Sequence, residues 1–484
     1  MFDLRPVLFV TGVLLALLAV AMGLPAIVDY VHGDPDWRVF TASASVTLFL
    51  GIILMAGNHV GRRGEFSVRQ VFLLTVAGWL AVSVAAAQPF VFSAALHLSP
   101  IDALFEAVSG VTTTGATVLR NLDRTPPGIL LWRGLLQWLG GMGFLVMALA
   151  VLPTLNIGGM QIFRLESGDR ADRVMPRAAT VTIGIVGLYA GLTGFLTLLL
   201  WAAGMSRFPA LIHAMTTISC GGFSTADGSI GSWHNPAVDW VMLLGMLIGG
   251  SPFMIYLHLV EQRWQTARKN RQLRLYLRIF LSASLILALW LIIEQDAKPL
   301  PALRHAAFTA ASVMTGSGFA TLDWGQWSGL PVALLFFLTF VGGCAGSTAG
   351  GIKIFRFQIL FANARAQMVR MLHPSAVVLP HYDKRQIPEM ISESVLGFLF
   401  VYAVSFSVVA MGLGLVGLDF WTSLSASASA LANLGPGLAP SIGPLAGYAG
   451  LPDAAKVLLA AAMLFGRLEM FVFLALFAKG FWRG

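Results

Sequence analysis

The segment FTAASVMTGSGFAT at residues 308–321 has three counterparts elsewhere in the chain. These read LFEAVSGVTTTGAT (104–117), LIHAMTTISCGGFST (211–225) and SASASALANLGPG (425–437). When they are aligned on a shared glycine, all four have a serine or threonine six residues earlier. The glycines are Gly115, Gly222, Gly318 and Gly435, and the hydroxyl residues are Ser109, Thr216, Ser312 and Ser429. A fixed internal repeat reflects a repeated structural unit, so we expect four copies of one unit in the fold.

The composition of the chain indicates that these units lie in a membrane. Of the 484 residues, 57% are hydrophobic and only 11% are charged, whereas a soluble protein carries about 25% charged residues. A soluble globular fold and a disordered chain are both excluded. The apolar run from Val7 to Val28 is longer than the core of a signal peptide, so we expect it to be retained as a first transmembrane helix.

Ten apolar segments are long enough to cross the hydrocarbon core, which takes about 20 residues. They are 7–29, 39–58, 70–97, 129–152, 178–204, 236–260, 276–295, 330–360, 390–417 and 454–478. Four further apolar stretches are too short to cross, and they are 101–113, 208–219, 303–315 and 420–433. Non-helical backbone at membrane depth must line a cavity, so we predict that each short stretch is a re-entrant pore helix followed by a glycine turn.

The predicted fold is therefore an all-α polytopic membrane protein. It has two leading transmembrane helices and four helix–pore-helix–helix repeats in a pseudo-fourfold arrangement around a central ion pore. The leading helices occupy residues 1–65, and the pore repeats occupy 66–177, 178–274, 275–385 and 386–484.

Charged residues predict the orientation. Most of the 31 lysines and arginines lie in alternate loops, together with both termini, which makes that side cytoplasmic. This asymmetry accounts for the net charge of +8, so no nucleic-acid partner is expected. The opposite loops carry acidic residues, which would attract cations to the outer mouth. These residues are Asp227, Asp239, Asp323 and Asp453.

The repeated unit suits cation conduction. A short helix that ends within the membrane directs its carbonyl dipoles at the centre, and the extended backbone after it can turn carbonyl groups toward an axis. Glycine permits the conformation that this requires. Glycine-rich packing between helices is the simpler alternative, but it does not account for four copies with matched offsets and the same sidedness.

Several motifs closely resemble the membrane subunit of bacterial Trk potassium uptake systems, in the Trk/Ktr/HKT superfamily. Besides the four glycine turns they are QWLGGMGF (137–144), GGMQIFRLES (158–167), VGGCAGSTAGGIKIFR (341–356) and FGRLEMF (465–471). The resemblance covers essentially the whole chain. It implies potassium as the transported ion, the bacterial inner membrane with its lipid as the setting, and a homodimer with one pore in each subunit. It also implies a cytosolic ring of Trk-type regulator subunits that bind NAD or ATP/ADP, with no cofactor on this chain.

The resemblance assigns the potassium filter to four stretches. These are Thr112, Thr113, Thr114 and Gly115; Ser219, Cys220, Gly221 and Gly222; Thr315, Gly316, Ser317 and Gly318; and Ala432, Asn433, Leu434 and Gly435. None of them is the TVGYG of tetrameric potassium channels, and Ala432 offers no hydroxyl group to an ion. Permeation by sodium therefore stays open.

A glycine-rich stretch interrupts the eighth predicted span. It consists of Gly342, Gly343, Cys344, Ala345, Gly346, Ser347, Thr348, Ala349, Gly350 and Gly351. Each glycine destabilises a helix by about 1 kcal/mol relative to alanine, so we expect a loop within the membrane. The resemblance makes this loop the gate. A phosphate-binding loop is excluded because Ile352 separates Gly351 from Lys353 and no serine or threonine follows the lysine.

We expect Arg467 to be the only strong cation inside a predicted span. Burying it costs several kcal/mol without partners, which indicates a functional role. The resemblance supports a position beneath the filter, where Arg467 would help the loop to close the pore. Pairing with Glu469 and snorkelling to the cytoplasmic face are the alternatives.

Two other classes of function are weighed against a channel. A proton-coupled symporter needs a titratable relay within the membrane, whereas Glu106, His213 and His305 suit structural contacts better. A membrane-embedded enzyme needs a motif such as HExxH, which is absent from the sequence. The basic loops 158–177, 261–278 and 353–385 are either orientation signals or a dock for an acidic regulator.

Overall fold

The computed structural model describes residues 3–59, 66–147, 174–262, 264–382 and 385–482. In this part of the chain, seven helices are long and apolar enough to cross a membrane. They are α1 (Arg5–His32), α2 (Trp37–Gly57), α3 (Val68–Phe92), α5 (Pro127–Val146), α8 (Val174–Ala202), α13 (Arg271–Glu294) and α17 (Glu389–Leu415). The predicted span 129–152 runs beyond the described residues, and the motif at 158–167 lies outside them.

The span predicted at 236–260 is not one continuous helix. It consists of α10 (Pro236–Gly249) and α11 (Phe253–Val260), which are bent by 95° relative to each other. The break contains Pro252, which has no N–H group to donate to the helix, directly after Gly250 and Ser251. A single straight span was therefore the wrong prediction at this position.

Two further predicted spans are also divided. As expected, the span at 330–360 is split into α15 (Leu330–Phe340) and α16 (Ile354–Leu372) by an intramembrane loop. The span at 454–478 was expected to be continuous, but it is split into α19 (Asp453–Arg467) and α20 (Met470–Ala475). Glu469 lies between them with a φ of 59°, which no α-helix accommodates.

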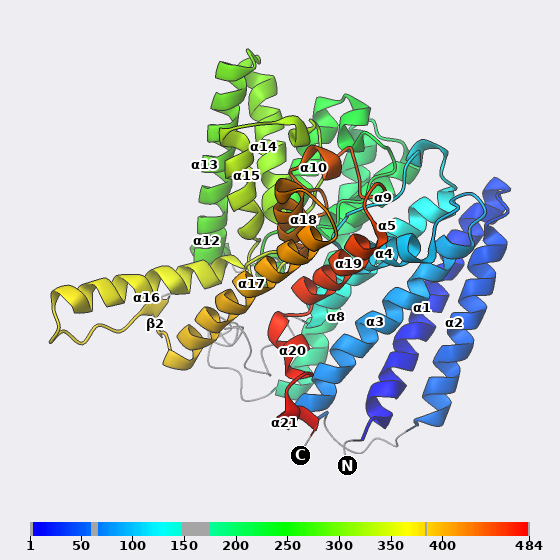
Figure 1. The fold of residues 1–484 in the computed structure, drawn as a ribbon, viewed down its shortest axis with the longest axis horizontal. Helices are drawn as coiled ribbons and strands as arrows, with labels where there is room; N and C mark the ends of the chain where they lie inside the picture. Colours follow the sequence, from blue (N-terminus) through cyan, green and yellow to red (C-terminus); the bar gives the residue numbers. More distant parts are fainter. Residues whose placement is uncertain (1–2, 60–65, 148–173, 263, 383–384, 483–484) are drawn as a thin grey trace.

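All four predicted pore helices are present. They are α4 (Pro100–Val111), α9 (Arg207–Ile218), α14 (Pro299–Thr315) and α18 (Phe420–Ala432). Local sequence fixes where two of them begin, because Ser99 and Asp419 accept hydrogen bonds from the first turns of α4 and α18. Figure 1 shows both termini at the same end of the molecule, below these helices. The predicted all-α fold of two leading helices and four repeats around a central pore is confirmed.

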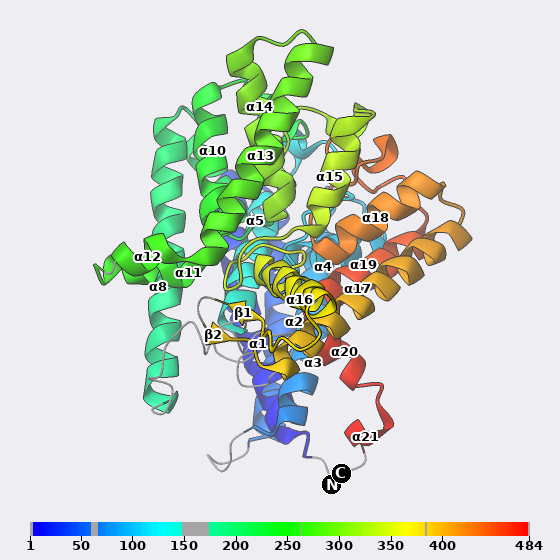
Figure 2. The ribbon, with the colours of Figure 1, turned by 90° about the vertical axis from the view of Figure 1, so that its left-hand side faces the viewer.

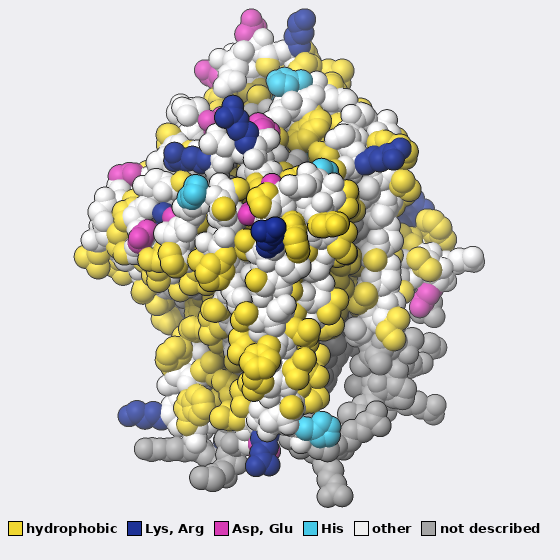
Figure 3. All heavy atoms as spheres, turned by 90° about the vertical axis from the view of Figure 1, so that its right-hand side faces the viewer, with side chains coloured by type: hydrophobic (Ala, Val, Ile, Leu, Met, Phe, Trp, Pro, Cys, Tyr) yellow, Lys and Arg dark blue, Asp and Glu magenta, His cyan; other side chains and the backbone are white. Residues whose placement is uncertain are grey.

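Shorter elements complete the described chain. They are α12 (Trp264–Lys269), α21 (Lys479–Trp482), η1 (Leu122–Arg124), η3 (Ser229–Trp233), η4 (Trp324–Gln326), η5 (Pro440–Ile442), and the antiparallel strands β1 (His381–Tyr382) and β2 (Arg385–Gln386). Figure 2 shows β1 and β2 next to α16. On the face seen in Figure 3, hydrophobic side chains are most frequent below the middle, whereas charged ones lie over the upper half and at the lower end.

Candidate functional site

The turns after the four pore helices share one backbone conformation. In each copy the residue two positions before the aligned glycine has a positive φ, and so does the glycine. The first set is Thr113 (54°), Cys220 (54°), Gly316 (74°) and Asn433 (52°), and the glycines are Gly115 (86°), Gly222 (81°), Gly318 (73°) and Gly435 (97°). A Cβ penalises this region, so the shared conformation is imposed by the surrounding structure rather than by local preference.

The aligned glycines close a ring around a common axis. A Cβ atom added to Gly115 would lie 2.1 Å from the carbonyl oxygen of Gly221. The same construction on Gly222, Gly318 and Gly435 gives 1.5 Å to Ser317, 2.4 Å to Leu434 and 2.6 Å to Thr114. Every glycine thus abuts the carbonyl group that precedes the glycine of the next repeat, and the fourth abuts the first. No side chain fits at any of the four positions.

Hydrogen bonds to the pore helices hold the turns in place. The amide before each glycine donates to the carbonyl oxygen five residues earlier, at the predicted serine or threonine. The four pairs are Thr114 to Ser109 (2.8 Å), Gly221 to Thr216 (2.8 Å), Ser317 to Ser312 (3.0 Å) and Leu434 to Ser429 (3.0 Å). In the last two copies the hydroxyl also donates, from Ser312 to the oxygen of Phe319 (2.6 Å) and from Ser429 to that of Gly435 (2.7 Å). The repeated hydroxyl seen in the sequence therefore supports the turn in those copies.

The fourth copy lacks the hydroxyl present three residues before the glycine in the others. In the first and third copies, Thr112 and Thr315 occupy this position and donate to carbonyl oxygens of their own helices, at 2.7 and 2.8 Å. In the fourth copy Asn433 performs a different task, because its Nδ2 donates to Thr114 Oγ1 and to the carbonyl oxygen of Met463, both at 2.9 Å. The amide side chain thereby links the fourth turn to the first.

Gln137 of α5 supports the second turn from behind. Its Nε2 donates to the carbonyl oxygen of Gly221 at 2.6 Å, and its Oε1 accepts from the amide of Phe223 at 3.0 Å. Gln137 is the first residue of the motif QWLGGMGF, and this role was not predicted. A buried amide side chain in an apolar span was the signal that could have identified it.

A buried ion pair stands behind the first turn. Arg133 Nε lies 2.8 Å from Glu106 Oε1, and Glu106 also accepts the amide of Val118 at 2.9 Å. Arg133 Nη1 reaches the carbonyl oxygen of Ser224 at 2.9 Å, so the pair joins the first two repeats. Glu106 makes a structural contact, as expected.

The two histidines also make local contacts. His213 bonds the carbonyl oxygen of Pro209 at 2.8 Å and the hydroxyl of Ser224 at 3.1 Å. His305 Nδ1 lies 2.9 Å from Thr321 Oγ1. Both histidines therefore make the structural contacts that were predicted for them.

The loop 342–351 lies against the ends of two pore helices. Thr348 Oγ1 donates to the carbonyl oxygens of Ile218, at the end of α9, and Gly249, at 2.8 and 3.1 Å. A Cβ on Gly350 would be 2.0 Å from the carbonyl oxygen of Ala432, at the end of α18. The loop is therefore packed directly on the segments that carry the second and fourth turns.

Two buried cations hold this loop. Arg467 Nη1 donates to the carbonyl oxygen of Thr348 at 3.1 Å, and Lys353 Nζ donates to those of Ala349 and Ser347. The aromatic ring of Phe144 lies 4.0 Å from the guanidinium carbon and 5.4 Å from the ammonium nitrogen. Together the two cations bind three successive carbonyl groups of the loop, and both lie beside the same ring.

The expectation that Arg467 is the only strong cation in a span is wrong. Arg133, Lys353, Arg356 and Lys456 are also buried in regions predicted to span. Neither alternative for Arg467 holds, because its exposure is 2% and Glu469 pairs with Arg356 at 2.7 Å. Lys353 begins the basic stretch 353–385 directly after the loop, and only its tertiary contacts reveal that it is buried.

The fold and the closed ring of backbone carbonyl groups define a cation-transporting membrane protein built from four pore repeats. The chain belongs to the TrkH family, whose model, described as a cation transport protein, matches residues 39–482. This is a family of cation transporters and not a class of enzymes.

Similar proteins cover the same length. The chain is 38% identical over 481 residues to the Trk system potassium uptake protein TrkI of Halomonas elongata, covering 99% of this chain and 97% of that protein. It is 37% identical over 485 residues to TrkH of Escherichia coli, covering 99% of both. The crystal structure of the potassium transporter TrkH from Vibrio parahaemolyticus superposes with a TM-score of 0.91 at 34% identity and covers 100% of both chains.

Proposed function

We propose that this chain is the ion-conducting membrane subunit of a potassium uptake system. The observation that carries the proposal is the ring in which each aligned glycine abuts the carbonyl group of the next repeat. Its relatives are named potassium uptake proteins, which supports potassium as the cargo. Potassium would pass inward through this ring.

The filter in this proposal consists of the four turns named from the sequence, 112–115, 219–222, 315–318 and 432–435. Stacked carbonyl groups from four turns replace the hydration shell of the ion, and the C-terminal ends of four pore helices add negative potential at the same place. A membrane potential of 100 mV contributes about 2.3 kcal/mol per charge, which drives uptake without coupled chemistry.

The loop 342–351 is the gate in this proposal. Its contacts with α9, α18, Arg467 and Lys353 correspond to a closed state, because a loop seated beneath the ring and two positive charges both oppose the passage of a cation. Opening requires the loop carbonyl groups to leave the two cations.

The proposal extends to the membrane setting of the chain. The distribution of lysine and arginine supports the inner membrane orientation with both termini cytoplasmic. On the outer side Arg304 pairs with Asp239 at 3.2 Å, so this carboxylate contributes less to a negative vestibule than predicted. The family resemblance supports a homodimer on a cytosolic regulator ring that binds NAD or ATP/ADP.

The test is the reversal potential of the purified protein in a planar bilayer, with potassium on one side and sodium on the other. We expect it to move toward the potassium equilibrium value at fixed pH. Gly318→Ser should lose this selectivity, because its Cβ would lie 2.4 Å from the carbonyl oxygen of Leu434. Gly414→Ser is the control, since nothing lies within 4 Å of a Cβ there.

Two results would overturn the proposal. Equal selectivity in the two variants would mean that the ring is not the filter. A reversal potential that follows the pH gradient would favour the proton-coupled symporter.

A further inference from the structure

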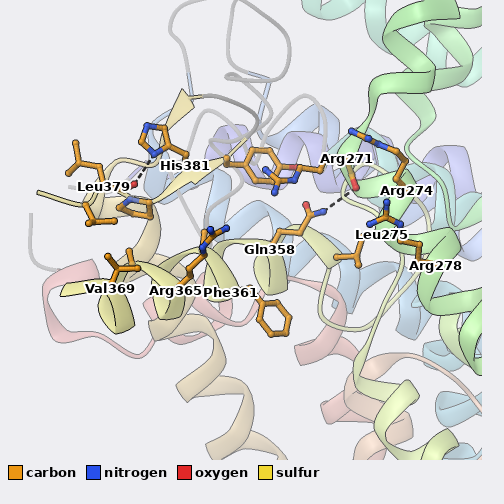
Figure 4. A pocket seen from close by; sticks show the side chains of 15 residues that line it. Arg271, Arg274, Leu275, Arg278, Gln358, Phe361, Arg365, Val369, Leu379 and His381 are labelled. Atoms are coloured by element: carbon orange, nitrogen blue, oxygen red, sulfur yellow. Dashed lines mark hydrogen bonds between the residues drawn. The ribbon is translucent and has the colours of Figure 1, made fainter. Parts of the chain in front are cut away.

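A basic cavity of about 620 Å³ lies between the first turns of α13 and the helix α16. Figure 4 shows its lining, to which α13 contributes Arg271, Arg274 and Arg278, and α16 contributes Arg365. The segment before β1 closes one side, and Arg370 holds it there by donating to the carbonyl oxygen of Val378 at 2.7 Å. The cavity thus has walls from three separate parts of the chain.

Among the residues that the structure describes, the four arginines of this cavity have no counter-charge. Within the described residues, no carboxylate is within ion-pair distance of any of them, and the cavity lining contains no Asp or Glu. The first turn of α13 has no acidic residue either, although a helix N-terminus favours negative charge and disfavours cations. Arg271 and Arg274, in the first turn of this helix, therefore oppose its dipole. An anion in the cavity would remove that penalty.

Gln358 adds a feature that a simple inorganic anion does not satisfy. Its Nε2 donates to the carbonyl oxygen of Arg271 at 3.1 Å, which fixes the orientation of the amide. Its Oε1 is buried and has no hydrogen-bond partner among the described residues. The cavity therefore offers a hydrogen-bond acceptor beside several donors, which matches a ligand that carries both a phosphate and a hydroxyl group.

The cavity opens next to a surface that faces lipid. Arg274 and Arg278 are four residues apart on α13, and Leu281 and Leu285 continue the same helix face with exposures of 62% and 57%. Acyl chains packed against these leucines would place a lipid headgroup at the level of the arginines. Basic pockets between helices on the cytoplasmic side are suited to anionic headgroups.

We propose that this cavity binds the headgroup of an anionic phospholipid that carries a free hydroxyl, of the phosphatidylglycerol type. The arginines bind the phosphodiester, and Gln358 Oε1 accepts from a glycerol hydroxyl. Loop charge places this face of the protein on the cytoplasmic side.

The site is directly connected to the loop 342–351. Gln272, next to Arg271 on α13, accepts a hydrogen bond at its Oε1 from the amide of Ala345 at 3.0 Å. On the other wall, α16 begins at Ile354, three residues after the loop. A lipid that bridges α13 and α16 would therefore restrict the movement of the loop between them. This consequence, unlike the binding site itself, rests on the proposed function.

The binding test is native mass spectrometry of the purified full-length chain with phosphatidylglycerol or phosphatidylcholine added. The variant carries Arg274→Gln and Arg278→Gln, and the control carries Arg268→Gln and Lys269→Gln, which remove two positive charges outside the cavity. With about 1 kcal/mol for each basic residue, the cavity variant should bind phosphatidylglycerol about 30-fold more weakly. The control variant should bind phosphatidylglycerol as tightly as the wild-type chain does. All three proteins should bind phosphatidylcholine equally.

Equal binding of phosphatidylglycerol by the cavity and control variants would overturn the proposal. Displacement of the lipid by millimolar glycerol phosphate at the same site would assign the cavity to a soluble phosphate instead. If size-exclusion chromatography shows that the double variant does not fold, Gln358→Leu replaces it, and it should reduce binding of phosphatidylglycerol relative to phosphatidic acid.

Flux measurements then separate the site from its consequence. Potassium flux in vesicles with and without phosphatidylglycerol should differ for the wild-type chain and not for the cavity variant. Loss of lipid binding without any change in flux would retain the site and refute the link to the loop. Absence of potassium flux from all proteins, with lipid binding intact, would count against the proposed function alone.

Discussion

Substitution of Arg467 by glutamine should release the loop 342–351. The arginine donates to the carbonyl oxygen of Thr348 at 3.1 Å and lies with Lys353 beside Phe144. Glutamine removes the charge, and its shorter side chain does not reach this carbonyl group from the same backbone position. The loop then retains the contacts of Thr348 with α9 but loses one of its two cationic partners.

The size of the effect follows from the kind of contact that is lost. A hydrogen bond from a charged donor contributes about 1.5–3 kcal/mol. If the bond exists only when the loop is closed, its loss raises the ratio of open to closed protein about 10- to 150-fold, since 1.4 kcal/mol is a factor of ten. Removing a buried positive charge from the pathway of a cation acts in the same direction.

The assay is potassium flux into vesicles that contain the purified chain without any regulator. Arg467→Gln should raise the basal rate by at least tenfold, and Lys353→Met should do the same through Ala349. Arg467→Lys keeps the charge but loses the planar fork of the guanidinium, so we expect an intermediate rate. The exposed Arg268→Gln is the matched control and should leave the rate unchanged.

A double-variant cycle makes the reasoning refutable. If Arg467 and Lys353 hold adjacent carbonyl groups of one loop, their effects on the basal rate should be less than multiplicative, because the first release already frees most of the loop. Unchanged flux in both single variants would show that neither cation holds the gate. Reduced flux in both, with normal folding, would mean that the cations keep the pathway open rather than closed.

Three further predictions concern the supports of the ring. Gln137→Leu leaves the carbonyl group of Gly221 without its 2.6 Å partner and should lower selectivity for potassium over sodium, measured by reversal potential. Gln137→Glu also lacks the N–H donor and should have the same effect. Tyr448→Phe removes the 2.7 Å bond to the carbonyl oxygen of the fourth glycine and should change single-channel conductance while the melting temperature falls by only a few degrees. Arg356→Met leaves Glu469 as an unpaired buried charge and should destabilise the protein by about 3–5 kcal/mol in a thermal unfolding assay, an effect that Arg356→Met with Glu469→Gln should partly reverse.

The pore repeats could be predicted from the sequence because their signals are local. Each pore helix begins and ends within a few residues of the predicted stretch, and the aligned glycines sit at the positions of closest approach. A neighbouring carbonyl group requires glycine at one position, and the turn requires a hydroxyl residue at another. These two requirements recur at fixed offsets along the chain. Four repetitions of those offsets distinguish them from chance.

The buried cations could not be placed in the same way. Lys353 stands between a glycine-rich loop and an amphipathic helix, and Arg356 lies in the first turn of that helix, where the sequence equally suits a cytoplasmic segment. Arg356 pairs with Glu469, 113 residues away, and Lys353 lies beside the ring of Phe144, which is also far along the chain. Hydropathy registers the charge of a residue but not the distant carboxylate or carbonyl group that compensates for it.

The bend in the second repeat and the loop in the third are best understood as one structure. The break between α10 and α11 leaves the carbonyl groups of Gly249 and Gly250 without helical partners, and the amides of Thr348 and Cys344 donate to them at 3.2 and 2.9 Å. In return the amide of Phe253, at the start of α11, donates to the carbonyl oxygen of Gly346 at 2.9 Å. Backbone groups inside a membrane cannot be left unpaired without a cost of several kcal/mol each.

Neither irregular segment is therefore stable in this form without the other. Any movement that withdraws the loop must provide new partners for these backbone groups, either from water that enters the pore or from a straighter α10 and α11. Because Pro252 prevents a continuous helix, water is the more accessible partner. Opening of the loop should consequently coincide with hydration of the cavity beneath the ring, and hydrogen exchange at the amides of Cys344 and Thr348 should accelerate in Arg467→Gln.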